Sequence, residues 1–201
     1  MTLRTIAAAL FLLMAPGFAW ATPVIGDPAP DFTLMDSNGT EQSLSDFLGQ
    51  RVILEWTNHG CPYVGKHYGT GNMQSLQREA TEAGVVWLSI ISSAPGRQGY
   101  VSGEEANNLT ATRGAYPTAV LFDPDGHVGH AYDARTTPGM YVIDEAGILR
   151  YQGAIDDQPT ARRSSVEGAN NYVRQALSDL DAGREVQIAE TQQYGCSIKY
   201  R

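Results

Sequence analysis

The chain has 201 residues, with 14 lysines and arginines against 22 aspartates and glutamates, which gives a formal net charge of −8. This acidic balance argues against nucleic acid or an anionic membrane surface as a partner. Once a leader at the N-terminus is set aside, about 180 residues remain, a length that suits a single domain with a sizeable core.

Residues 1–21 have the pattern of an export signal. Arg4 precedes the apolar run 6–14, and residues 19–21 end in the small-x-small pattern of a cleavage site. Pro16 and Gly17 break the run and no stop-transfer segment follows, so cleavage after Ala21 is favoured over an anchor helix. We therefore expect a periplasmic or secreted protein of net charge about −9, with no stable membrane insertion after cleavage and in an oxidising compartment.

The remaining residues alternate between predicted strands and helices. In chain order, the pattern predicts a β-hairpin around 31–39, a short helix at 44–48, a strand at 52–56, one long helix from about 62 to 83, a strand at 85–91, a helix from 102, a strand at 118–122, a hairpin of strands at 140–144 and 148–154, and a last helix over 166–180. This order predicts an α/β fold with a central mixed β-sheet flanked by helices. We expect one domain at 22–185 and a tail at 186–201.

A single cysteine stands where the long helix is expected to begin. Cys61 precedes Pro62, and position 64, where a C-x-x-C pair would have its second cysteine, holds valine. Backbone N–H groups and the dipole at a helix start favour thiolate, and can lower a cysteine pKa from about 8.5 into the range of roughly 3.5–7.5. Pro62 suits the first helical position because its missing N–H would have had no partner. Cys61 is therefore the candidate nucleophile.

These features resemble the redoxin branch of the thioredoxin-like superfamily, which includes TlpA-like proteins and the alkyl hydroperoxide reductase/thiol-specific antioxidant group. The residues that carry the resemblance are Gly26, Ala29, Pro30, Phe32, Leu34, Asp36, Gly39, Leu44, Asp46, Gly49, the strand ending at Trp56, Cys61-Pro62 and the segment 137–144. The resemblance covers about residues 24–182. It implies a thioredoxin-like fold with an N-terminal β-hairpin and antioxidant or thiol oxidoreductase activity.

The same resemblance implies that Pro138 is a cis-proline presented beside Cys61. A cis bond there would leave the Thr137 backbone free to pair with an extended thiol substrate. A proline in front of a strand is ordinarily only a boundary residue. Arg135 is the nearest cation in this segment, and we interpret it as a surface residue.

Cys196 is the second of two cysteines and follows the last predicted helix. Two interpretations stand side by side. In one, Cys61 and Cys196 form a permanent structural bridge, worth about 4–5 kcal/mol in the chain-entropy model. In the other, Cys196 is a resolving thiol on a mobile tail, which attacks the product formed at Cys61. Only redox potential separates them.

Glu55 is an unexpected acid on a predicted central strand. Related oxidoreductases place a buried carboxylate beneath the cysteine as a proton acceptor, but Glu55 could equally point to a sheet edge. His59, Lys66 and His67 could add positive potential near Cys61. For Lys66 and His67 a solvated position is preferred, because a helix directs few side chains at its own start.

The residues around Cys61 depart from both well-known reaction types. The antioxidant family has proline seven positions before its cysteine, Thr or Ser three before, and an arginine where this chain has Pro138; Leu54 and Asn58 occupy the first two positions. Peroxide activation needs such donors. Val64 removes the vicinal resolving thiol, so fast general dithiol exchange is disfavoured as well.

The prediction is therefore an exported thiol–disulfide oxidoreductase or slow thiol peroxidase, with a thiol or disulfide protein or a small-molecule thiol as electron donor and with no cofactor. The alternative is a non-catalytic binding or metal-handling module on the same fold, with a structural Cys61–Cys196 disulfide. His59, Cys61 and His67 are suitable metal ligands by type. Their spacing is weak evidence, so redox chemistry ranks above metal binding.

Overall fold

The central sheet has seven strands in the order β2-β1-β5-β4-β3-β7-β8. A computed structural model describes residues 23–201, so the predicted export signal lies outside the described part. The strands are β1 (Thr33–Asp36), β2 (Glu41–Ser43), β3 (Val52–Trp56), β4 (Val86–Ile91), β5 (Ala119–Phe122), β7 (Gly139–Ile143) and β8 (Leu149–Gly153). The β3/β4 and β4/β5 pairs are parallel and the other pairs antiparallel. The predicted mixed sheet and N-terminal hairpin are confirmed.

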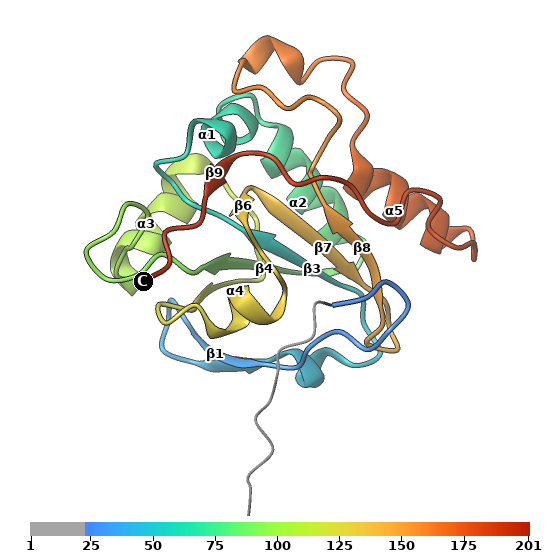
Figure 1. The fold of residues 1–201 in the computed structure, drawn as a ribbon, viewed down its shortest axis with the longest axis horizontal. Coiled ribbons are helices and arrows are strands. Elements are labelled where there is room, and N and C mark those ends of the chain that lie inside the picture. The colour runs from blue at the N-terminus through green and yellow to red at the C-terminus, as the bar shows by residue number, and fades with distance from the viewer. Residues whose placement is uncertain (1–22) are drawn as a thin grey trace, which may run out of the picture.

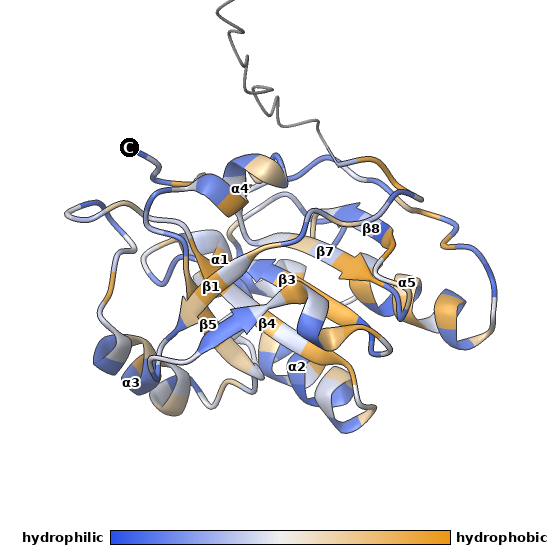
Figure 2. Ribbon diagram, turned by 90° about the horizontal axis from the view of Figure 1, so that it is seen from below, coloured by the Kyte–Doolittle hydropathy of each residue, from blue (hydrophilic) through white to orange (hydrophobic). Residues whose placement is uncertain are grey.

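Helices cover both faces of this sheet (Figure 1). They are α1 (Pro62–Gly69), α2 (Asn72–Glu82), α3 (Gly103–Arg113), α4 (His127–Ala131), α5 (Tyr172–Asp181) and the 3₁₀ turns η1 (Leu44–Phe47) and η2 (Arg163–Ser165). Apolar residues of α2 and α5 pack on one face of the sheet, and those of α4 and η1 pack on the other. In Figure 2 the outer helix α3 is largely hydrophilic, whereas β7 is largely hydrophobic.

The single long helix predicted over residues 62–83 is wrong, because the chain breaks into α1 and α2. Gly71 takes a φ of 77° at the N-cap of α2, a left-handed conformation that suits glycine. The break is only two residues long, from Thr70 to Gly71, which is too short for a helical pattern to reveal it. The last helix likewise begins at Tyr172 and not near residue 166. Asn171 is its N-cap, and the Asn171 side chain accepts a hydrogen bond from Arg174 N.

Four short elements were not predicted. They are α4, the 3₁₀ turn η2 and the two strands of a separate small sheet, β6 (Thr136–Thr137) and β9 (Cys196–Ser197). Two to five residues are too few for a periodic pattern. β9 belongs to the C-terminal segment, drawn in red in Figure 1, which runs from α5 past β6 to the side of α3.

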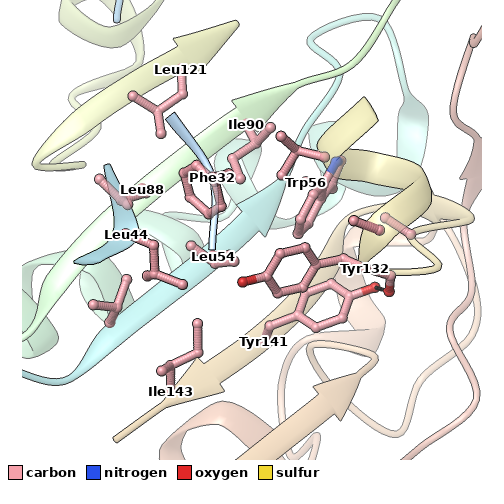
Figure 3. Packing of buried hydrophobic residues seen from close by; sticks show 14 of the residues in the cluster. Phe32, Leu44, Leu54, Trp56, Leu88, Ile90, Leu121, Tyr132, Tyr141 and Ile143 are labelled. Carbon is pink, nitrogen blue, oxygen red and sulfur yellow. Dashed lines mark hydrogen bonds between the residues drawn. The ribbon is translucent and has the colours of Figure 1, made fainter. Parts of the chain in front are cut away.

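Three buried aromatic rings fix the end of β3 that leads into the Cys61 loop (Figure 3). Trp56 lies 5.3 Å from Tyr132 and 5.0 Å from Tyr141 between ring centroids, and the two tyrosines are 5.4 Å apart. Such pairs each contribute about 0.5–1.5 kcal/mol beyond the area they bury. The indole N–H of Trp56 donates to Ser92 Oγ at 3.0 Å. The strand end is therefore held rigidly.

Candidate active site

Cys61 lies at the N-cap of α1, as the sequence predicts. Its φ of −83° and ψ of 124° are extended, Pro62 is the first helical residue, and Cys61 N donates to Asn58 O at 3.0 Å. The residue is only 1 % exposed. The nucleophile candidate is thus at a helix start, but it is covered.

The surroundings of Cys61 lower the pKa of its thiol. Burial has the largest effect and opposes this, but it is outweighed by hydrogen bonds from the Cys196 side chain, Val64 N–H and the Thr137 side chain. The Thr137 hydroxyl is buried and makes no other interaction that satisfies the distance and angle of a hydrogen bond among residues 23–201, so it is free to turn towards the sulfur. When Cys61 is protonated, its thiol donates to Thr137 O at 3.2 Å. The arrangement therefore favours the nucleophilic thiolate.

The Thr137–Pro138 peptide bond is cis, which confirms that prediction. Thr137 and Pro138 are both buried, and Thr137 lies on β6. The strand that pairs with β6 is β9, in an antiparallel register that places Thr137 opposite Cys196 and Thr136 opposite Ser197. The backbone position expected to receive an extended substrate is occupied by the protein's own C-terminal segment.

Cys196 is partly exposed, and both cysteines are free thiols in this structure. Burial, the hydrogen bond to Cys61 and the charge of Cys61 together raise the pKa of Cys196 to about 11. The two shifts belong to one pair, in which Cys61 is the thiol that ionises first and Cys196 is the one that keeps its proton. The structure thus brings together Cys61, Cys196, Thr137 and Pro138, four of the five residues predicted for the site.

The fifth predicted residue, Glu55, is fully buried on β3 and does not point to a sheet edge. Its carboxylate accepts hydrogen bonds from four side chains, none of which is Cys61: Tyr68 Oη at 3.0 Å, Gln77 Nε2 at 3.1 Å, Trp87 Nε1 at 2.9 Å and Ser89 Oγ at 2.9 Å. A buried carboxylate with this many donors is well satisfied. A catalytic role for Glu55 stays a prediction.

Lys66 and His67 are not solvated, so that prediction is wrong. They are 1 % and 0 % exposed, on the side of α1 that faces the segment after β8 and the C-terminal segment. Lys66 Nζ lies 3.6 Å from Asp156 Oδ2 and donates to Tyr194 Oη at 3.2 Å. Burial, with the charge of Lys66, lowers the pKa of His67 to about 3, so His67 is neutral.

Asp156 and Tyr194 complete this buried polar cluster and were missed in the sequence. The Tyr194 hydroxyl donates to Asp156 Oδ1 and lies 3.4 Å from His67 Nε2. Burial, together with the neighbouring Asp156, raises the pKa of Tyr194. Neither residue belongs to a motif; the only available signal was that Tyr194 stands two positions before Cys196.

The other candidate cations play smaller parts. Arg135 pairs with Asp133 at 2.7 Å and its side chain is 74 % exposed, which agrees with its interpretation as a surface residue. His59 is exposed, on the loop before Cys61. In residues 23–201 no cluster of three or more His, Cys, Asp or Glu side chains has the arrangement of a metal site. The described helices also include none that is both long and apolar enough to cross a membrane.

The fold and the cis-proline facing a helix-start cysteine define a thioredoxin-like redoxin. A family model described as the AhpC/TSA family matches residues 25–152, well over half of the chain, so the chain belongs to that family. The match ends before β9, so the C-terminal segment with Cys196 lies outside it.

The relatives of this chain are redox proteins by name. The chain is 28 % identical to thiol-disulfide oxidoreductase ResA of Geobacillus kaustophilus over 63 % of this chain and 67 % of the relative. It is 27 % identical to thiol:disulfide interchange protein DsbE of Allochromatium vinosum, over 68 % and 71 % of the two chains. A Mycobacterium tuberculosis protein named as a peroxiredoxin is 28 % identical over 66 % and 78 %.

Two solved structures share the fold over most of their length. A hypothetical protein from Sinorhizobium meliloti has a TM-score of 0.76 at 23 % identity and covers 90 % of this chain and 97 % of its own. An uncharacterized conserved protein from Geobacillus kaustophilus has a TM-score of 0.74 at 27 % identity, covering 89 % and 93 %. Both similarities extend well beyond the part that the family model matches.

Proposed function

We propose that this protein is a thiol–disulfide oxidoreductase in which Cys61 attacks and Cys196 resolves. The observation that carries the proposal is the direct pairing of Cys196 with Thr137, which places the Cys196 thiol beside the Cys61 thiol, so that each shifts the pKa of the other. Two cysteines held side by side by a strand pairing can exchange a proton and form a bond with little backbone movement. The site therefore replaces the missing vicinal thiol at position 64 with one from the C-terminal segment.

The proposed reaction consumes one disulfide and yields two thiols. The Cys61 thiolate attacks a substrate disulfide RSSR′, forms the Cys61–SR mixed disulfide and releases R′S⁻, which takes a proton. Cys196 then attacks the Cys61 sulfur, the Cys196 proton passes to the departing RS⁻, and a Cys61–Cys196 disulfide remains. Once Cys61 is in a neutral mixed disulfide, its charge no longer raises the pKa of Cys196, so the second thiol becomes easier to ionise.

Peroxide reduction is the weaker candidate, because the donors that would polarise an O–O bond are occupied elsewhere. The Asn58 side chain donates to Gln98 O at 3.2 Å and accepts from Gly60 N at 2.9 Å. Arg135 is exposed and paired with Asp133. A thiol–disulfide exchange needs no such donor set, only a good thiolate and an accessible partner.

The test follows the sulfurs by mass spectrometry after a sub-stoichiometric dose of oxidised glutathione. The wild-type protein should accumulate the Cys61–Cys196 bridge, and Cys196→Ser should trap glutathione on Cys61. The matched control is the double variant Cys196→Ser/Ser197→Cys, which keeps two thiols but moves one to the exposed side of β9, since strand side chains alternate. If the control forms the bridge as fast as the wild type, or the wild type forms none, the resolving role is lost.

Export of the protein is part of the same proposal. The pattern in residues 1–21 supports cleavage after Ala21 and a domain beginning at residue 22, followed by the tail at 186–201. N-terminal sequencing of the protein from the periplasm or culture medium tests this, and an intact Met1 would contradict it.

A further inference from the structure

β9 lies beside the reactive sulfur. Cys61 stands at a helix start, a place that is commonly open to solvent, yet it is 1 % exposed, and Cys196 is paired with Thr137 next to it. Thiol–disulfide exchange depends on access to the sulfur that is attacked. While β9 is docked, the geometry suits attack by Cys196 on Cys61 and leaves no path for an outside disulfide.

The C-terminal segment is fastened on both sides of β9. After the strand, Ile198 N donates to Arg135 O at 3.0 Å, and Tyr200 donates to Ala134 O at 2.8 Å while its ring stacks on His130 at 4.2 Å. Before the strand, Tyr194 enters the buried cluster of Lys66, His67 and Asp156. The release of β9 is therefore controlled by contacts outside the strand itself.

Of these contacts, those of Tyr194 involve buried ionisable side chains. Its hydroxyl donates to Asp156 Oδ1 and accepts from Lys66 Nζ, two ionisable side chains that are 2 % and 1 % exposed. Its ring also lies 5.8 Å from that of Tyr63. Hydrogen bonds to charged groups are stronger than those between neutral groups, and a buried charge that loses a partner is costly. Tyr194 stands two residues before Cys196. Its contacts therefore affect the site by holding Cys196 in position.

We propose that Tyr194 is the positioning residue that sets how often β9 leaves Cys61: docked, the strand serves the resolving step, and released, it admits the substrate disulfide. This inference rests on the proposed function for its meaning, but the release can be measured without any turnover. The hydrogen bonds with Lys66 and Asp156 keep Tyr194 in place, and Tyr194 in turn keeps β9 paired with β6.

The test compares the rate at which iodoacetamide modifies Cys61 in the reduced protein, with each cysteine followed by peptide mapping. Tyr194→Phe removes the hydroxyl and keeps the ring, and we expect Cys61 to react at least roughly tenfold faster, because the variant loses the two hydrogen bonds that the hydroxyl makes with Asp156 and Lys66. Tyr116→Phe is the matched control, because the ring of this 42 % exposed tyrosine lies against Arg78 on another part of the fold. It should leave the rate unchanged.

A merely structural role for Tyr194 makes a different prediction. Release of β9 exposes little surface, so the alkylation rate of Tyr194→Phe should depend weakly on urea, whereas exposure through global unfolding depends on it steeply. Asp156→Asn is a second variant. It keeps an oxygen at the Oδ1 position for Gln158 N and the Tyr194 hydroxyl but removes the negative charge, so we expect a change in the same direction and of smaller size. A steep urea dependence, or unchanged rates in both variants, overturns the inference.

Failure of this inference is distinguishable from failure of the proposed function. If Tyr194→Phe leaves Cys61 protected while oxidised glutathione still produces the wild-type bridge, the resolving role stands and the gating role of Tyr194 falls. If no bridge forms but Tyr194→Phe accelerates alkylation, the control of β9 release by Tyr194 stands and the resolving role of Cys196 falls.

Discussion

Replacing Gly195 by alanine should detach β9 from Cys61. Gly195 has a φ of +136°, and a Cβ built on it would lie 2.0 Å from Thr137 O and 2.8 Å from Thr137 C. Both neighbours are backbone atoms next to the buried Pro138, so neither can move aside as a flexible side chain would. The strand itself has to shift by about 1 Å or more, which is enough to break its hydrogen bonds with β6.

The cost has two parts. An L side chain in this region of φ costs about 1–2 kcal/mol, and losing the hydrogen bonds of a two-residue pairing costs about 1–2 kcal/mol more. Together they disfavour the docked strand by about 2–4 kcal/mol, or roughly 30- to 700-fold in its population relative to the released strand.

Two measurements test this. Alkylation of Cys61 by iodoacetamide in the reduced protein should become faster, and formation of the Cys61–Cys196 bridge with oxidised glutathione should become slower. Gly168→Ala is the matched control, because its φ of +75° brings the same kind of backbone strain with nothing within 4 Å of the added Cβ. Equal behaviour of the Gly195→Ala and Gly168→Ala variants would refute the argument that this close approach docks the strand.

Three further outcomes are expected. Absorbance at 240 nm should show Cys61 ionising below its ordinary pKa, and Cys196→Ala should raise that pKa because one stabilising hydrogen bond is lost; identical titrations in both proteins would contradict the coupling. Burial keeps His67 neutral with a pKa of about 3 against 6.5 unfolded, so its contribution to the free energy of unfolding is complete above pH 6.5 and falls by on the order of 4 kcal/mol towards pH 3. Denaturant titrations of His67→Gln should therefore lose less stability over that window than the wild type. Glu55→Ala should destabilise the fold by about 3 kcal/mol or more, since it leaves Trp87 Nε1 unpaired in a cavity, and Glu55→Gln by less; equal midpoints in urea would count against this reading.

Local chemistry made half of the site predictable. The Cys61-Pro62 pair at a helix start and the strand that ends at Trp56 follow from residues adjacent in the chain, and both were found where expected. The cis bond before Pro138 was inferred from resemblance to a family, not from periodicity, and it was confirmed. Features decided within a few residues, or shared across a whole fold, can be predicted from one sequence.

The other half depends on partners far away in the chain. Nothing near Lys66 indicates that its charge is buried, because its partner Asp156 is supplied by the segment after β8. Sequence counting suggested that Cys196 meets Cys61, but not that it does so as a strand paired with Thr137. A pairing of two residues leaves no pattern, and its energy comes from tertiary contacts on either side.

Hydrogen bonds between Thr191 and the end of β8, which we call the β8 clamp, limit how far the Cys196 thiol can move. Thr191 N donates to Gln152 O at 3.1 Å, and its hydroxyl accepts from Ala154 N at 2.9 Å. If the hydrogen bonds of the β8 clamp stay formed, five residues connect Thr191 to Cys196, and this segment can span at most about 18 Å. A thiol on so short a tether has an effective concentration in the millimolar range or above. An outside thiol would have to reach comparable concentrations to intercept the Cys61 mixed disulfide before the chain's own cysteine returns.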